Sequence, residues 1–92
     1  MNYAEAVAKG IQLLDEKVPG WHERIDLRDF DMSSGARCVL GQIYGTYEKG
    51  LCELELWVGI SHGFSSNRFV AMPTLTHLWT EEINKRREEI AV

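Results

Sequence analysis

The side chains best suited to chemistry in this chain are two cysteines and three histidines. One set of them has the composition of a tetrahedral zinc site: Cys38, Cys52, His62 and His77. Structural zinc sites, however, usually take their ligands in close pairs such as C-x2-C, and here the intervals are long and irregular. The spacing therefore argues against a zinc site, and we expect neither a metal nor a cofactor.

A thiol nucleophile is the second chemical possibility. Cys38 follows Arg37 and lies in the first turns of a predicted helix, and both features favour a reactive thiolate. A base would come from one of the three histidines: His22, His62 or His77. Val39 and Leu40 follow directly, and such an apolar block is typical of a buried thiol that behaves as a small hydrophobe. We expect no enzyme and keep Cys38 chemistry as an alternative.

An acidic cluster precedes this cysteine. Asp26, Asp29 and Asp31, with Glu23 nearby, could form a metal or acid–base site. They lack the glycine and the glutamate that complete a calcium loop. We therefore expect the three aspartates to serve as cap and turn residues.

A basic cluster lies near the other end of the chain, at Lys85, Arg86 and Arg87. Glutamates surround it at Glu81, Glu82, Glu88 and Glu89. They cancel most of its field, so we favour a solvated helix face in which Glu81 pairs with Lys85 and Glu82 with Arg86. A helix that contacts nucleic-acid phosphates is kept as an alternative.

The run CVLGQIYG, residues 38–45, is apolar apart from one amide, and we interpret it as a structural motif carried by Cys38, Gly41, Gln42, Tyr44 and Gly45. The four-residue spacing of its glycines permits close approach of a neighbouring helix. Because most buried polar side chains bond to backbone, we expect Gln42 to tie its helix to a loop. A ligand- or partner-binding amide is the alternative.

Hydrophobic periodicity predicts a helix over residues 3–17, with an apolar stripe at Tyr3, Val7, Ile11, Leu14 and Val18. Gly10 weakens that helix unless another helix packs closely against it. Pro19 and Gly20 end it, and a single turn over residues 21–25 should dock Trp21 and Ile25.

A second, central helix is predicted over residues 34–47, capped by Ser33 or Ser34. Residues 50–59 fit both helix and strand patterns, and we favour a short helix, with a two-stranded element near residues 54–58 as the alternative. The last helix should begin in the run Pro73–Thr76 with one of its threonines as cap. Its apolar stripe is Leu75, Leu78, Trp79, Ile83 and Ile90. The fold class is therefore mainly α, a small helical bundle with its gaps filled by Trp21, Phe30, Phe64 and Trp79.

Size and charge narrow the possibilities further. The chain has 92 residues and a net charge of −4, which indicates one domain, 1–92, and argues against nonspecific nucleic-acid or membrane binding. Its first residues show no secretory pattern, and no stretch approaches the roughly 18–20 apolar residues of a membrane span. We therefore expect a cytosolic protein with free thiols.

Several pieces of the sequence form a familiar combination: residues 25–27, residues 32–34, the CVLGQ-x-YG run, Gly63-Phe64, and Leu75-Thr76 with Trp79, Ile83 and Arg86-Arg87. Together they span roughly residues 20–87, and the pattern resembles small proteins of actinobacteriophages, mycobacteriophages among them, and of their actinobacterial hosts. The resemblance implies a bacterial cytosol and an accessory protein that acts by binding. It implies no catalytic residue and no cofactor.

We expect an interaction protein that binds a host or phage protein, or a second copy of itself. Trp57 and Phe69, if exposed, would form an adhesive patch. The alternatives are a nucleic-acid-associated regulator that uses Lys85, Arg86 and Arg87, and a small enzyme that uses Cys38.

Overall fold

The computed structural model describes residues 3–57, 59–66 and 68–91, with the side chains of Phe69, Ile90 and Ala91 outside the description. The elements are α1 (Tyr3–Lys17), η1 (Trp21–Arg24), α2 (Val39–Tyr44), α3 (Tyr47–Glu53), η2 (Ile60–His62), η3 (Phe69–Ala71) and α4 (Met72–Ala91). The described residues contain no strand, so the mainly α prediction is confirmed. The two-stranded alternative is wrong for residues 54–57, and Val58 lies outside the described residues.

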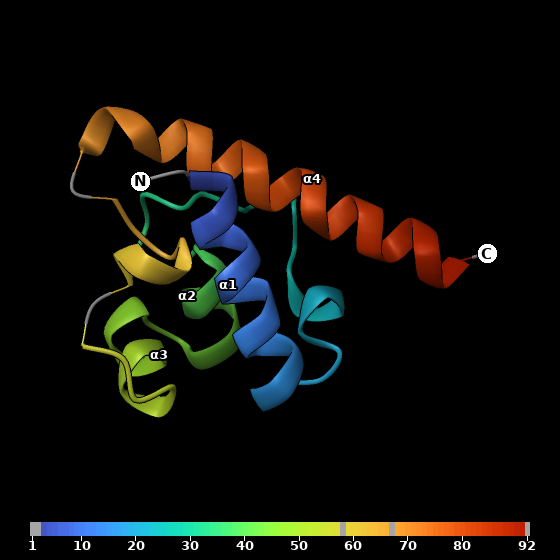
Figure 1. Cartoon of the computed structure of the whole chain (residues 1–92), viewed down its shortest axis with the longest axis horizontal. Coiled ribbons are helices and arrows are strands. Elements are labelled where there is room, and N and C mark those ends of the chain that lie inside the picture. Colours follow the sequence, from blue (N-terminus) through green and yellow to red (C-terminus); the bar gives the residue numbers. More distant parts are fainter. Residues whose placement is uncertain (1–2, 58, 67, 92) are drawn as a thin grey trace.

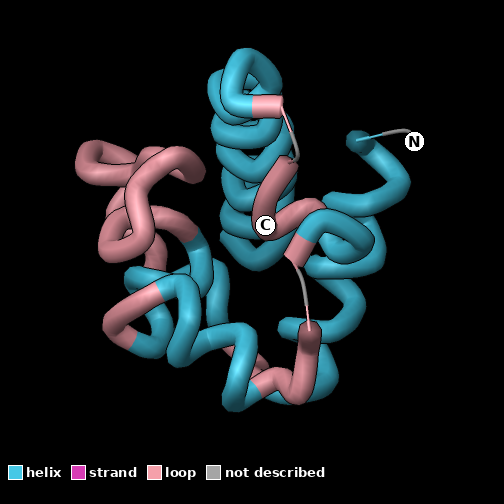
Figure 2. The backbone as a smooth tube through the Cα atoms, turned by 90° about the vertical axis from the view of Figure 1, so that its left-hand side faces the viewer, coloured by secondary structure: helices cyan, strands magenta, loops and turns pink. Residues whose placement is uncertain are grey.

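The longest helix, α4, lies along the 37 Å long dimension of the molecule, and its C-terminal end projects past the other elements (Figure 1). Helix α1 crosses it steeply, with α2 and α3 packed below. The chain between η1 and α2, residues 25–38, is called the loop segment. A view nearly along α4 places α1 on one side of that helix and this loop segment before α2 on the other (Figure 2). Among the described residues, no helix combines the length and apolar character that crossing a membrane requires.

The core is built around Trp79, which is completely buried. Phe64 stacks on its indole with ring centroids 5.5 Å apart, and Trp21 meets it edge-on at 5.7 Å. Trp79 Nε1 donates to the carbonyl of Gly63 at 2.7 Å, so its one polar atom is satisfied. The prediction that Trp21, Phe64 and Trp79 fill the core is confirmed, whereas Phe30 is only partly buried.

Gly10 allows this aromatic cluster to meet α1. A Cβ atom at this position would collide with the carbonyl oxygen of His62 and touch the Trp79 ring at 3.0 Å. The close neighbour that requires glycine at position 10 is therefore η2, together with Trp79 of α4. Gly63, at φ +70°, turns the chain directly after η2 and packs against the backbone of Val7.

The predicted central helix over residues 34–47 is wrong as a single element. It is divided into α2 and α3 at Gly45, where φ is +103°, a value that ends a helix and suits glycine alone. Thr46 then caps α3 by accepting from the backbone N–H of Lys49 at 3.1 Å. Gly45 therefore acts as a helix terminator and not as a site of helix contact.

The cap of α2 is Cys38, and the expected caps Ser33 and Ser34 are wrong. Cys38 Sγ accepts from the N–H of Gly41 at 3.3 Å, while the Ser34 hydroxyl accepts from Arg37 one turn earlier. A Cβ on Gly41 would collide with the carbonyl of Gly35. The close neighbour of Gly41 is thus a loop, where the spacing had indicated a helix.

Gln42 ties α2 to the preceding loop, as predicted. Its Oε1 accepts from the N–H of Asp26 at 2.6 Å, and its Nε2 donates to the carbonyls of Asp26 and Arg37 at 3.2 and 3.0 Å. One amide therefore pairs with both backbone groups of Asp26. The predicted turn role is also confirmed for Asp26, which accepts from the N–H of Arg28, and for Asp31, which accepts from that of Ser33; the Asp29 side chain instead pairs with Arg37.

Helix α4 is joined to the rest by its arginines. Arg86 makes a two-pronged ion pair with Asp15 of α1 at 2.6 and 2.7 Å, and Asp15 also accepts from Trp21 Nε1 at 2.9 Å. Arg87 donates to the carbonyls of His22 and Ile25 at 2.7 and 2.5 Å. Arg86 therefore pairs with distant Asp15, whereas helix spacing had indicated Glu82 as its partner.

The other predicted pair is also replaced, since Glu81 pairs with His77 and Lys85 with Glu82. The expected cap at Thr74 or Thr76 is wrong, because α4 already begins at Met72, directly after η3. Ile90, predicted in the apolar stripe, has its side chain outside the described residues.

Replacing Asp15 by Asn should reduce the free energy of unfolding by roughly 1–2 kcal/mol at pH 7, a modest value because both partners are about one-third exposed. The bonds from Arg86 and then Trp21 hold the pKa of Asp15 below its ordinary value. The stabilisation is therefore complete above the unfolded-state pKa of about 3.9 and lost as the pH falls through the lower folded-state pKa.

Urea unfolding at a series of pH values measures this difference. The gap between the wild type and Asp15→Asn should begin to narrow below about pH 4 and close as the pH falls through the folded-state pKa. Exposed Glu16 on the same helix gives the matched control, Glu16→Gln, which should leave stability unchanged. A gap that did not narrow at all as the pH fell below about 4 would contradict the ion-pair explanation.

Replacing Gln42 by Glu should destabilise the fold by about 1–2 kcal/mol. The carboxylate keeps the bond from Asp26 N–H but faces two carbonyl oxygens with no proton to donate. Gln12→Glu, on the exposed face of α1, is the control for the added charge. Equal thermal midpoints for the two variants would show that the amide tie contributes little.

Candidate functional site

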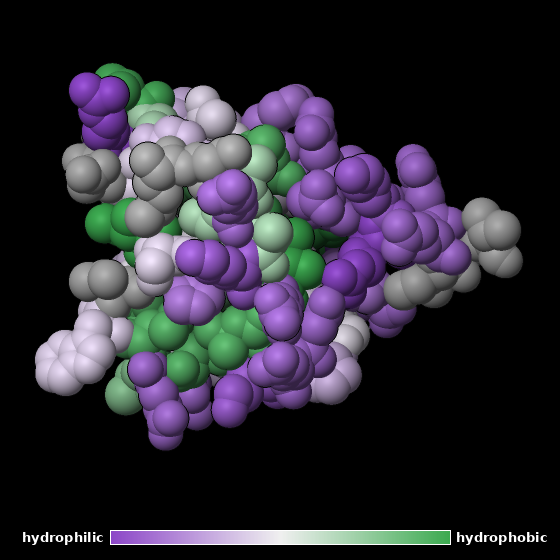
Figure 3. Space-filling view, viewed as in Figure 1, coloured by the Kyte–Doolittle hydropathy of each residue, from purple (hydrophilic) through white to green (hydrophobic). Residues whose placement is uncertain are grey.

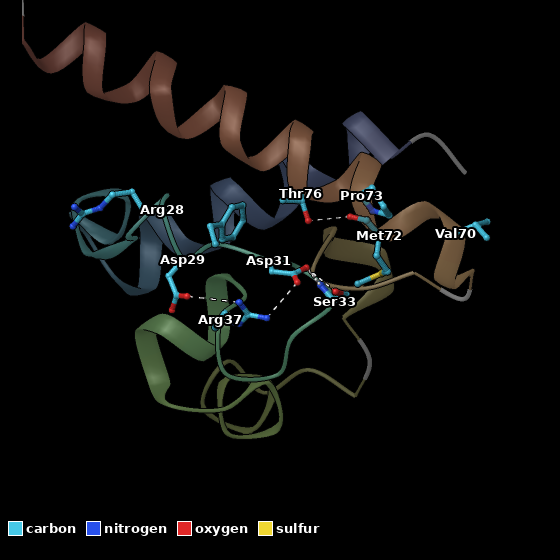
Figure 4. Close-up of a pocket in the computed structure, with 10 residues that line it drawn as sticks. Arg28, Asp29, Asp31, Ser33, Arg37, Val70, Met72, Pro73 and Thr76 are labelled. Atoms are coloured by element: carbon cyan, nitrogen blue, oxygen red, sulfur yellow. Dashed lines mark hydrogen bonds and ion pairs between the residues drawn. The ribbon is translucent and has the colours of Figure 1, made fainter.

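A groove of about 720 Å³ runs beside the first turns of α4 (Figure 4). One wall comes from the loop segment before α2, and the other comes from η3 and the start of α4. Phe30, Met72 and Pro73 supply apolar surface, and Thr76 lies between them. Three other hollows measure about 180–220 Å³, so the groove stands out by size.

Hydrogen bonds hold the two walls together. The Thr76 hydroxyl accepts from the N–H of Met32 and donates to the carbonyl of Met72, both at 3.0 Å. This side chain, which the sequence had suggested as a helix cap, therefore connects the loop segment to α4. The groove is fixed by a contact between residues 44 positions apart in the chain.

Charges of both signs line the groove. The Arg37 guanidinium lies between Asp29 and Asp31, at 3.7 and 3.6 Å, and Arg28 is almost fully exposed at the far end. The hydroxyl and then the N–H of Ser33 bond to Asp31 and hold the pKa of that carboxyl below its usual value. The rim therefore carries two aspartates and two arginines, whose formal charges balance one another.

An exposed apolar side chain extends the groove at the η3 end. Val70 is 83% exposed, next to Met72 and Pro73 at the start of α4 (Figure 4). The predicted patch residue beside it, Phe69, has its side chain outside the described residues. Such exposure of a large aliphatic residue at the end of a partly apolar groove is typical of a contact surface.

Trp57, the other predicted patch residue, is 98% exposed, as the sequence-based hypothesis required. It follows the turn that ends α3, in which the N–H of Leu56 bonds to the carbonyl of Leu51 at 2.9 Å and that of Glu55 to Cys52 at 3.1 Å. Glu55 has φ +59° in this turn, where glycine is the usual residue. The favoured short helix over residues 50–59 is thus confirmed as far as Glu53, where α3 ends, and is wrong for residues 54–57.

The apolar surface elsewhere is more scattered. In the space-filling view, hydrophobic side chains gather where α1 and α4 cross and over α3, while the projecting end of α4 is hydrophilic (Figure 3). The crossing holds a hollow of about 180 Å³ bordered by Val7, Ile11 and Leu78. This hollow is smaller than the groove, so it could hold less of a binding partner.

The thiol chemistry is not supported by the site of Cys38. Its side chain is 1% exposed, and burial raises the pKa of the thiol, which disfavours the thiolate. The described residues that line the hollow beside it include no histidine. The candidate base His22 is instead buried against the edge of Trp21.

The zinc set is not assembled either. Cys38 is buried and Cys52 exposed, and the described residues hold no group of three or more histidine, cysteine, aspartate or glutamate side chains placed to bind a metal. Both amide atoms of Gln42 are engaged by backbone, which favours its structural role. Tyr44 is partly buried against the core.

The basic cluster is divided by the fold. Lys85 is exposed near Glu82, but Arg86 and Arg87 are half-buried and bonded within the molecule. Of the three basic residues, only Lys85 therefore lies on the predicted solvated face, together with exposed Glu81, Glu88 and Glu89. The two arginines bind protein groups that the sequence did not identify.

Sequence analysis did not identify the groove. Its walls come together from segments about 40 residues apart, and only the alternation of charged residues around Phe30 was visible in the chain. Neither a protein-family model, nor a curated protein, nor a solved structure matches the chain.

Iodoacetamide at neutral pH should modify Cys52 and leave Cys38 intact in the folded protein, because one thiol is exposed and the other buried. Mass spectrometry of peptides after a short reaction measures both sites. In urea, the two thiols should react at similar rates. Modification of Cys38 in the folded protein at a rate equal to or above that of Cys52 would reopen the enzyme alternative.

Proposed function

We propose that this chain is a small cytosolic accessory protein of the actinobacteriophage type, which binds a host or phage protein through the groove beside α4. The observation that carries the proposal is the groove itself. It combines about 720 Å³ of space, apolar side chains of Phe30 and Met72, and a charged rim.

The surface chemistry supports a protein partner. Burying apolar side chains of the groove would contribute about 25 cal/mol for each Å² removed from water, and exposed Val70 adds to that area. The rim around Arg37 carries both signs of charge, which orients a polar partner without strong net attraction. Interfaces of this kind combine an apolar centre with a polar rim.

The two other function classes have less support. A nucleic-acid regulator would need free cations, and Arg86 and Arg87 already bind Asp15 and the carbonyls that end η1. A Cys38 enzyme would need an accessible thiolate, and the thiol is buried. Self-association through exposed Trp57 is a second candidate, favoured by its 98% exposure.

The test is a cross-linked pull-down from actinobacterial lysate with three versions of the tagged chain. Val70→Asp places a charge at the groove end, and Trp57→Asp places the same charge outside the groove; both positions are exposed, so both variants should fold. A partner that uses the groove should be retained by the wild type and Trp57→Asp, and reduced on the order of tenfold by Val70→Asp.

Other results would count against the groove. Loss of the partner with Trp57→Asp alone, together with a mass that rises with concentration for the wild type, would assign binding to the α3 turn. Recovery of nucleic acid that disappears at high salt would favour the regulator. No partner recovered from host or infected-cell lysate would contradict the interaction proposal.

A further inference from the structure

A hollow of about 220 Å³ lies next to the groove and shares Ser33 and Met72 with it. Three of the residues that line it carry a sulfur atom in the side chain: Met32, Cys38 and Met72. Their exposed fractions are 3%, 1% and 9%, so each is at least nine-tenths buried. The chain has five methionines and cysteines in all, and three of them border this one hollow.

The fold holds these three residues from different segments. Met32 and Met72 are linked through the hydroxyl of Thr76, which bonds to the N–H of one and the carbonyl of the other. Cys38 is fixed by the bond from its N–H to the carbonyl of Ser34 at 3.1 Å. In the close-up, the thioether of Met72 points from α4 toward the segment that carries Ser33 (Figure 4).

The surroundings of the thiol favour a cation that replaces its proton. Burial and then the carboxylate of Glu48, which also lines the hollow, raise the pKa of the Cys38 thiol, so that a thiolate here calls for an accompanying cation. The N–H of Gly41 already bonds to Cys38 Sγ and would stabilise a thiolate. Thiolate and thioether sulfurs are soft ligands, and such ligand sets select soft ions such as Cu(I) over zinc, calcium or magnesium.

We propose that Met32, Cys38 and Met72 form a binding site for a soft monovalent metal ion of the Cu(I) class. On binding, the S–H bond of Cys38 breaks, its proton passes to solvent, and a sulfur–metal bond forms. The two thioethers each donate a lone pair, and no atom changes its oxidation state. The spacing argument against a zinc site considered only cysteine and histidine ligands, so it does not apply to a site that contains two methionines. The site does not depend on the proposed interaction.

The experiment measures Cu(I) binding under anaerobic conditions by competition with a chromophoric Cu(I) chelator. All variants carry Cys52→Ser, so that the exposed thiol cannot bind the ion. We expect one Cu(I) per chain, weakened about tenfold by each of Met32→Leu and Met72→Leu and about 100-fold by Cys38→Ser. Leucine conserves volume, and serine is a good helix cap, so these variants should fold.

A second readout distinguishes a three-sulfur site from a single reactive thiol. With methionine methyl groups labelled by ¹³C, titration with Ag(I), a redox-inert substitute, should shift the NMR signals of Met32 and Met72, which the two leucine variants assign. Thermal unfolding of each variant shows that the fold is retained. Binding that Cys38→Ser removes but both leucine variants leave unchanged would overturn the proposal. No Cu(I) binding in the Cys52→Ser background would overturn it equally.

Discussion

The burial of Trp79 is the constraint on which the rest of this structure depends. Its indole needs space on α1, which Gly10 provides, and a partner for its N–H, which the carbonyl of Gly63 provides. Phe64 and Trp21 pack on its two sides and bring η1 and the segment after η2 against α4. A large aromatic residue contributes much of the core in a chain of this size, so three distant segments are positioned by one side chain.

With α4 placed in this way, its first turns become a wall for the surface features. The Thr76 hydroxyl bonds to Met32 of the loop segment before α2, and Met72 lines a hollow together with residues of that segment. Met72 borders both the groove and the sulfur-lined hollow. A partner in the groove and an ion in the hollow would thus contact the same side chain, which offers a physical route between them.

The loop segment keeps its shape without regular secondary structure. Aspartate and serine side chains replace helix hydrogen bonds at Asp26, Asp31 and Ser34, and Gln42 and Thr76 fasten it from the two sides. The bonds at Asp26, Asp31 and Ser34 join residues close in sequence, whereas those of Gln42 and Thr76 join distant segments. An irregular wall fixed by side chains can present charged groups toward a groove, whereas a helix in the same place would direct them around its whole circumference.

The sequence by itself determined the elements whose signals are local: α1, the turn at η1 and the presence of a last helix. It also indicated that the Gln42 amide bonds to backbone, but only the fold decided that its partner is Asp26. Periodicity and turn residues act over a few positions, so they can be identified along the chain. Only the tertiary structure decided the division of residues 34–47, the pairing of Arg86 with Asp15, and the groove. Those features depend on which distant groups meet when the core closes, and burial and long-range electrostatics then override local preference.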